Sequence, residues 1–141
     1  MAAESKATTV WEGSLFEGRG TTSFASGTFE DVEVTWARRT ERTEGTTSPE
    51  ELLAAAHASC YCMALSNILA EAGNAPERLE ATATVGFVPG EGVSGSHIEV
   101  RGRVPGIDQQ AFEQAAQDAG KNCPISQALA IEITVDATLE S

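Results

Sequence analysis

The sequence predicts an α+β fold in a single domain that spans residues 1–141. Stretches in which apolar and polar residues alternate, as in half-buried strands, lie on both sides of one long apolar segment with helical character. The strand and helix patterns do not alternate regularly, which argues against repeated β-α-β units. A length of 141 residues is typical of one domain, and a hydrophobic share of 41% is sufficient for a core.

The first third of the chain is expected to form strands. Residues 10–16 and 21–24 lie on either side of a glycine turn at residues 18–20 and can pair with each other. Residues 32–36 alternate apolar and polar side chains with a period of two. Residues 38–47 are polar, so we expect them to form a connection.

The best-defined element is a helix that is predicted to begin at Pro49. Ser48 is a suitable N-cap, proline suits the first helical position, and Glu51 completes a capping box with Ser48. The helix is expected to run to residue 71 or 72 and to stop at Gly73.

Residues 52–70 of this helix carry no formal charge if His57 is neutral. A membrane-spanning helix is one interpretation, but Ser59, Ser66 and Asn67 weaken it. A helix with apolar groups on most faces is expected to be buried, and a domain this small has difficulty covering it on every side. We therefore predict a homodimer that shares its central helices.

The remainder of the chain is expected to alternate strands and helices. The predicted elements are strands at 79–88 and 98–104, a helix that Asp108 caps and Gly120 ends, a helical turn from Pro124, and a last strand at 131–139.

The charge pattern limits the partners. A net charge of −12 argues against nucleic acid and anionic membranes, because phosphate binding needs clustered basic residues. Three of the nine basic residues lie within five positions, at Arg38, Arg39 and Arg42. This cluster is either a solvated turn or the neighbourhood of an anionic group. Residues 1–10 lack an apolar core of signal-peptide length, so a cytoplasmic location is expected.

The residues that could take part in redox chemistry are the three cysteines, Cys60, Cys62 and Cys123. On a helix Cys60 shares a face with His57, whereas Cys62 points about 200° away and is expected to be a core residue. Cys123 precedes Pro124 and is a candidate N-cap, where the helix dipole favours an anion. Local electrostatics therefore favour Cys123 as the more acidic thiol, but the pattern does not say which thiol attacks.

A buried cysteine in the middle of a helix has a raised pKa, so Cys60 needs a cation before it can react. An arginine can bind a thiolate and a peroxide oxygen together, and a carboxylate can hold the arginine. Glu50 is available, but it lies about 15 Å from Cys60 along the helix axis. It would therefore act through an arginine or across a dimer interface.

His57 has three interpretations: a general base for Cys60, a satisfied core histidine, or an interface residue. A zinc site built from Cys60, Cys123, His57 and His97 is a further alternative, but no paired ligand spacing supports it. We expect neither a metal nor a cofactor.

Four segments resemble the OsmC family of the OsmC/Ohr superfamily and together span most of the chain. They are Trp11-Glu-Gly-Ser-Leu15, the helix segment at residues 48–66, Val104-Pro-Gly-Ile-Asp108 and Cys123-Pro-Ile-Ser126. The resemblance implies an OsmC-like fold, with mostly antiparallel sheets around a long buried central helix in an intertwined homodimer.

The resemblance also implies a thiol peroxidase that reduces organic hydroperoxides to alcohols. Cys60 would be the peroxidatic thiol that becomes a sulfenic acid, and Cys123 would resolve it as a Cys60–Cys123 disulfide. An external dithiol, such as a lipoylated protein, would reduce that disulfide. Leu52, Leu53 and Met63 would supply apolar walls for the peroxide.

Glu50 matches the glutamate that holds the catalytic arginine in the family. Arg39 is the favoured arginine, with Arg38 and Arg19 as alternatives. Two other functions remain open at this point. One is a noncatalytic ligand-binding or redox-sensing protein on the same fold, and the other is a cysteine hydrolase that uses Cys60 and His57.

Overall fold

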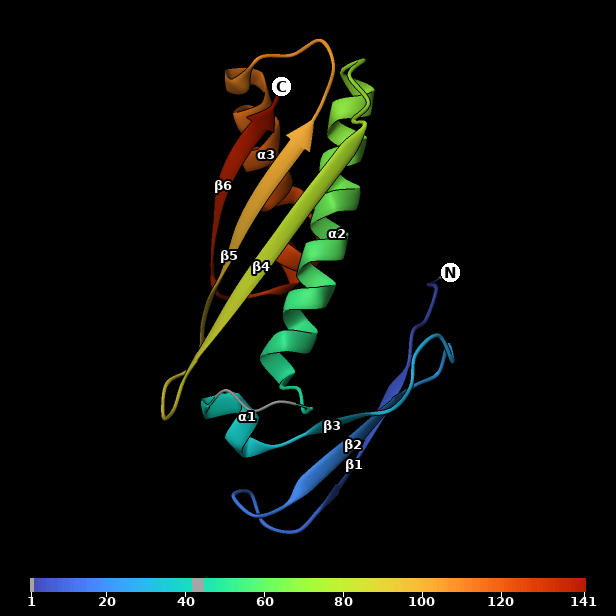
Figure 1. Ribbon diagram of the computed structural model, residues 1–141, viewed down its shortest axis with the longest axis vertical. Coiled ribbons are helices and arrows are strands. Elements are labelled where there is room, and N and C mark those ends of the chain that lie inside the picture. Colours follow the sequence, from blue (N-terminus) through green and yellow to red (C-terminus); the bar gives the residue numbers. More distant parts are fainter. Residues whose placement is uncertain (1, 42–44) are drawn as a thin grey trace. The chain divides into compact units, whose positions relative to one another are not determined.

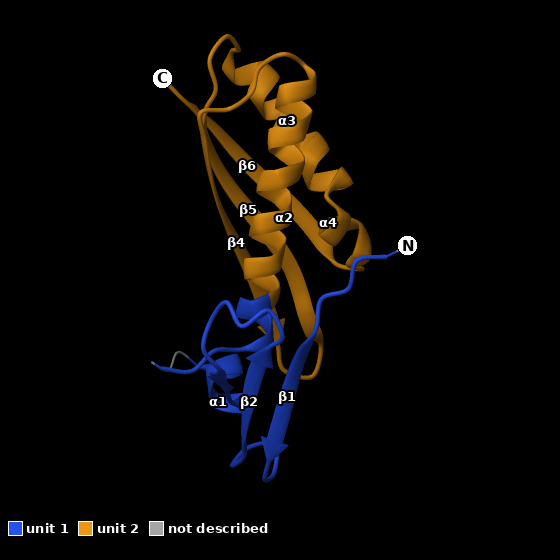
Figure 2. Ribbon diagram, turned by 90° about the vertical axis from the view of Figure 1, so that its right-hand side faces the viewer, with its two compact units in different colours: residues 1–52 blue, residues 53–141 orange. Residues whose placement is uncertain are grey.

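A computed structural model of the chain describes residues 2–41 and 45–141, which form two compact units (Figures 1 and 2). Residues 1–52 make up the first unit and residues 53–141 the second. Arg42 of the basic cluster lies outside the described residues. The elements are β1 (Ala7–Glu12), β2 (Arg19–Phe24), β3 (Val32–Val34), α1 (Trp36–Thr40), α2 (Pro49–Glu71), β4 (Arg78–Val88), β5 (Gly92–Arg103), α3 (Gln109–Asn122), α4 (Pro124–Ala128) and β6 (Glu132–Glu140). The α+β class predicted from the sequence is confirmed.

The first unit holds an antiparallel sheet with the strand order β1-β2-β3. Gly20 of β2 is required there, because a Cβ atom at this position would lie 2.7 Å from Cγ2 of Val34. The helix α1 follows β3, and Thr35 caps it by accepting a hydrogen bond from the backbone N–H of Arg38 at 3.1 Å. The expectation of a strand through Trp36 was wrong at this point, because the Thr35 cap starts a helical turn there.

The second unit holds the sheet β4-β5-β6, whose strands lie side by side in Figure 1. β4 and β5 pair antiparallel, whereas β5 and β6 pair parallel because α3 and α4 form the crossover between them. Figure 2 shows α2, α3 and α4 on one side of this sheet. The buried core of the unit comprises Tyr61, Leu65, Leu69, Ile98, Val100, Val104, Phe112, Ala115, Ala116, Ala119 and Cys123.

The helix α2 begins and ends as the sequence predicted. The Ser48 hydroxyl accepts a hydrogen bond from the backbone N–H of Glu51 at 3.1 Å. At the other end, Gly73 adopts a φ of 87°, and the Asn74 N–H donates to the Leu69 carbonyl at 2.8 Å. The Glu51 carboxylate accepts a hydrogen bond from the Thr47 hydroxyl, which adds a side-chain contact at the helix start.

One face of α2 is buried in the core of the second unit. Tyr61 and Leu65 are fully buried, whereas Met63 is 73% exposed. Between Leu52 and Ala70, the exposed residues of α2 are Ala55, Ala56, Ser59, Met63, Asn67 and Ala70, none of which carries a charge. By length and composition α2 could cross a membrane, but the core helix of a soluble protein has the same features. Its packing in the core of the second unit assigns it as such a core helix.

The sequence suggested that α3 ends at Gly120, but the helix continues to Asn122. A Cβ atom on Gly120 would lie 2.7 Å from Cγ2 of Val135 on β6. The glycine therefore permits close packing of α3 against the sheet, and Cys123 becomes the residue at which α3 ends and α4 begins.

Candidate functional site

Two thiols that are far apart in the sequence meet inside the second unit. Cys60 lies in the middle of α2, and Cys123 is the N-cap residue of α4. A hydrogen bond joins their side chains. Cys123 is fully buried and Cys60 is half-buried, and both are free thiols in this structure. Cys60 packs against the core cluster that includes Cys123.

The surroundings of Cys60 favour its neutral form. Burial raises the pKa of the Cys60 thiol, and the hydrogen bond to Cys123 raises it further. The backbone N–H of Ile125 donates a hydrogen bond to Cys60 and acts in the opposite direction. Ile125 lies in the first turn of α4, so the N-terminus of this helix supplies a hydrogen-bond donor to Cys60. Cys123 itself makes no side-chain capping bond.

His57 is a fully buried and doubly hydrogen-bonded histidine. Its Nδ1 lies 2.7 Å from the Ser96 hydroxyl on β5, and its Nε2 lies 2.8 Å from the Ser126 hydroxyl on α4. Burial lowers the pKa of His57, so the ring is neutral near pH 7. Of the three interpretations of His57, the structure supports the satisfied core histidine, because both ring nitrogens are already engaged.

The residues considered for zinc are not gathered into one site. His97 contacts the Thr134 hydroxyl and, at 3.1 Å, the Asp136 carboxylate, whereas His57 contacts the two serines. Over residues 2–41 and 45–141, no group of three or more histidine, cysteine or carboxylate side chains is placed to hold a metal ion.

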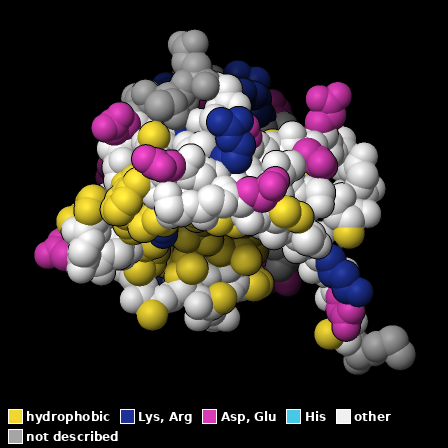
Figure 3. All heavy atoms as spheres, turned by 90° about the horizontal axis from the view of Figure 1, so that it is seen from below, with side chains coloured by type: hydrophobic (Ala, Val, Ile, Leu, Met, Phe, Trp, Pro, Cys, Tyr) yellow, Lys and Arg dark blue, Asp and Glu magenta, His cyan; other side chains and the backbone are white. Residues whose placement is uncertain are grey.

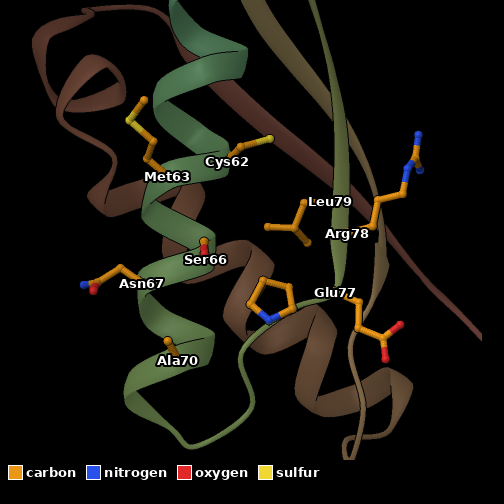
Figure 4. Close-up of a pocket in the computed structure, with 9 residues that line it drawn as sticks. Cys62, Met63, Ser66, Asn67, Ala70, Glu77, Arg78 and Leu79 are labelled. Carbon is orange, nitrogen blue, oxygen red and sulfur yellow. The ribbon is translucent and has the colours of Figure 1, made fainter.

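Cys62 lies on the side of α2 that faces Leu79, whereas Met63 points away from that strand (Figure 4). Both residues line an open groove of about 610 Å³ beside the start of β4. Burial raises the pKa of Cys62, and a hydrogen bond with the backbone of Ala81 opposes that shift. That Leu52, Leu53 and Met63 supply walls for a peroxide stays a prediction.

The ion pair of Arg39 with Glu50 lies within the first unit. The Arg39 Nε lies 3.0 Å from Oε1 of Glu50, and its Nη2 lies 3.1 Å from Oε2. Glu50 belongs to the first turn of α2, and only 8% of its side chain is exposed. This two-pronged geometry fixes the plane of the guanidinium group and leaves it positively charged.

The two alternative arginines have other partners. Arg38 donates to the Thr46 carbonyl at 3.2 Å and lies 3.6 Å from the Glu51 carboxylate. Arg19 lies 3.7 Å from the Glu33 carboxylate, and 69% of its side chain is exposed. Glu50 is therefore paired with Arg39 rather than with either alternative.

Arg39 also lines a pocket of about 320 Å³ in the first unit. The walls are mostly apolar and comprise Thr9, Trp11, Leu15, Thr22, Val34, Thr35, Trp36, Pro49 and Leu52. Figure 3 shows one face of the molecule, where hydrophobic side chains reach the surface among scattered acidic groups. The pocket combines a fixed cation with an apolar wall, which suits a ligand that has one polar atom and an organic body.

Sequence reasoning missed Ser96 and Ser126. Ser126 stands in the Cys-Pro-Ile-Ser segment, and Ser96 precedes Ile98 and Val100 on the buried face of β5. A serine in line with buried apolar residues signals a buried hydrogen-bond partner, and that signal was available in the sequence.

The α+β fold with one long central helix and two meeting thiols is that of the OsmC-like class. Residues 42–138 match the family model described as OsmC-like protein, and the chain belongs to this family. It is 39% identical to the peroxiredoxin OsmC of Escherichia coli K12, over the full length of both chains. It is also 32% identical to the organic hydroperoxide resistance protein of Xanthomonas axonopodis pv. citri, over 66% of each chain.

Solved structures show the same fold. A crystal structure from Legionella pneumophila, described as an organic hydroperoxide resistance protein OsmC, matches with a TM-score of 0.72 at 20% identity, covering 100% of this chain and 99% of the other. OhrB of Bacillus subtilis, an organic hydroperoxide resistance protein, matches with a TM-score of 0.70 at 22% identity and 98% coverage of both chains.

Proposed function

We propose that this protein is a thiol peroxidase that reduces organic hydroperoxides to alcohols. The observation that carries the proposal is the hydrogen-bonded contact of Cys60 with Cys123. Family membership supports it, because relatives are named peroxiredoxin OsmC and organic hydroperoxide resistance protein. The pairing of the two thiols is the arrangement that a two-cysteine cycle requires.

In the proposed cycle, the Cys60 thiolate attacks a peroxide oxygen and the O–O bond breaks. The alkoxide leaves, takes up a proton and becomes the alcohol, while Cys60 becomes a sulfenic acid. The Cys123 thiol then attacks the Cys60 sulfur, and water leaves as the disulfide forms. An external dithiol, such as a lipoylated protein, returns both cysteines to thiols and is itself oxidised to a disulfide.

Arg39 and Glu50 supply the activation that the thiol pair lacks. Because burial raises the pKa of Cys60, the thiolate needs a nearby cation to form near neutral pH. We assign this role to the Arg39 guanidinium, which Glu50 orients through two contacts. The apolar pocket beside Arg39 would bind the organic part of the peroxide.

The proposed active form is an intertwined homodimer in the cytoplasm. The exposed, uncharged face of α2 supports a dimer, because a second copy can cover an apolar helix surface that one chain leaves open. Arg39 then acts on Cys60 of its own subunit or on that of the partner. Mixed dimers of Cys60→Ser and Arg39→Ala subunits separate these cases, because activity returns only if the residues act across subunits.

Mass spectrometry after exposure to cumene hydroperoxide tests the proposed function. We expect a Cys60–Cys123 disulfide, with cumyl alcohol released in equal amount. A Cys60 that stays unoxidised favours the noncatalytic ligand-binding or redox-sensing alternative. The hydrolase alternative has less support, because the serine contacts of His57 occupy both nitrogens that a general base would use.

A further inference from the structure

His57 and Ser126 stand in the same arrangement as the two thiols. On α2, Cys60 follows His57 by three residues, and on the other segment Ser126 follows Cys123 by three residues. His57 contacts Ser126 at 2.8 Å, and Cys60 contacts Cys123. The two segments therefore run antiparallel, with one contact per helical turn, and the first contact sets the register of the second.

The segment that carries Cys123 needs a contact that fixes its position along α2. α4 has five residues, too few to be stable as an isolated helix, and Cys123 makes no side-chain capping bond. The Ser126 hydroxyl ties α4 to α2, while the Ser96 hydroxyl fixes the other nitrogen of the same imidazole ring to β5. Both bonds are buried, so water does not compete with them.

We propose that His57 is a positioning residue that, through Ser126, holds α4 in the register that brings Cys123 against Cys60 and the Ile125 N–H onto the Cys60 sulfur. The role rests on the proposed two-cysteine cycle for its biological meaning, but the register itself does not depend on a peroxide. Without the Ser126 contact, α4 samples other positions, and the effective concentration of Cys123 at Cys60 falls.

The test compares Ser126→Ala with Ser96→Ala. Each variant removes one of the two serine hydroxyls that bond the His57 ring. One buried ring nitrogen is then left without its partner, so we expect similar losses in Tm. Only Ser126→Ala cuts the tie to α4. The readout is the equilibrium fraction of Cys60–Cys123 disulfide in mixtures of reduced and oxidised dithiothreitol, measured by alkylation and mass spectrometry.

We expect the equilibrium constant for the disulfide to fall about tenfold in Ser126→Ala and by less than about threefold in Ser96→Ala. Ser126→Thr, which keeps the hydroxyl, should restore it. Equal shifts in the two alanine variants, or no shift in either, would overturn the proposal. So would the absence of any disulfide in the wild-type protein. If Ser126→Ala does not fold, His57→Phe fills the ring volume without either hydrogen bond and should show the same fall.

This design separates the register from the peroxidase activity. A wild-type protein that forms the disulfide with dithiothreitol but not with cumene hydroperoxide contradicts the proposed function and leaves the register intact. With peroxide, Ser126→Ala should accumulate Cys60 sulfenic acid that dimedone traps, because the attack by Cys123 is slowed more than the first oxidation, in which Cys123 takes no part.

Discussion

The two units of this chain hold different parts of the proposed chemistry. The first unit holds a fixed charge, the Arg39–Glu50 ion pair, beside an apolar pocket. In the second unit two thiols contact each other, and burial raises the pKa of Cys60 and lowers the pKa of His57. Cys60 thus lies where burial disfavours its ionisation, whereas the ion pair holds a charged guanidinium group but contains no thiol.

This contrast explains why neither unit is expected to act alone. Within the second unit, burial and Cys123 raise the pKa of Cys60, and the Ile125 N–H is the group that opposes them. A single backbone donor is a weak substitute for a full positive charge. The proposal therefore places nucleophile and activation on separate parts of the chain, and each part can be disabled separately.

The largest effect is expected from Cys60→Ser. Loss of the thiolate removes the nucleophile, so reduction of cumene hydroperoxide should fall to background in a coupled assay with a dithiol. Cys62→Ser is the matched control, since it removes a thiol two residues away on another side of α2 and should retain turnover. Activity that survives Cys60→Ser would refute the assignment of the nucleophile.

Arg39→Ala should be the next most harmful change. Without the guanidinium, the rate of Cys60 oxidation is expected to fall by about 10²-fold or more near neutral pH. The apparent pKa in the pH profile of this rate should also rise, because the thiolate loses its stabilising charge. Arg38→Ala serves as the control. A pH profile that Arg39→Ala leaves unchanged would show that Arg39 does not act on the thiolate.

Cys123→Ser should separate the first oxidation from the recycling step. Stopped-flow measurement of the first turnover is expected to change by less than about threefold, since Cys123 does not take part in breaking the O–O bond. Cys60 sulfenic acid should then accumulate and oxidise further to the sulfinic acid in excess peroxide. If the first turnover is lost as completely as in Cys60→Ser, Cys123 is needed before or during cleavage of the O–O bond, and its assignment as the resolving thiol alone is wrong.

The sequence predicted those features that depend on local signals. The ends of α2 follow from Ser48 and Gly73, each of which acts on the backbone beside it. The prediction at Gly120 was wrong because it also used a local signal. Glycine often ends a helix, but here the absence of a side chain at Gly120 makes room for Val135. The short helix α1 was missed because a single cap at Thr35 is a weak signal in a polar segment.

Other features depend on tertiary contacts that no local pattern encodes. His57 meets Ser96 and Ser126 across 39 and 69 residues of chain, so its role was open until the fold was known. The contact of Cys60 with Cys123 was implied by family resemblance alone. The choice among Arg19, Arg38 and Arg39 likewise needed the partners of each guanidinium, because sequence spacing does not fix which carboxylate an arginine meets.

The smallest expected effect concerns the charge of the buried His57 in the second unit. Burial lowers the pKa of His57 in the folded state, so this residue stabilises the fold fully above its unfolded pKa of about 6.5. As the pH falls below that value, the unfolded chain gains a proton that the folded chain resists. The free energy of unfolding should then decrease by up to about 1.4 kcal/mol per pH unit from this group.

Urea unfolding at pH 7.5, 6.5 and 5.5 measures this dependence. His57→Gln should be less stable than the wild type at pH 7.5, because it loses a hydrogen-bonded ring, but its stability should fall less steeply toward pH 5.5. His97→Gln, which removes the other histidine, is measured in parallel. An unchanged slope in His57→Gln would mean that His57 has the same pKa in the folded and the unfolded chain. A steeper fall in His57→Gln would mean that the folded chain binds this proton more tightly than the unfolded chain. The core of the second unit would then carry a buried positive charge one helical turn from Cys60, and the contrast with the Arg39–Glu50 ion pair of the first unit would no longer hold.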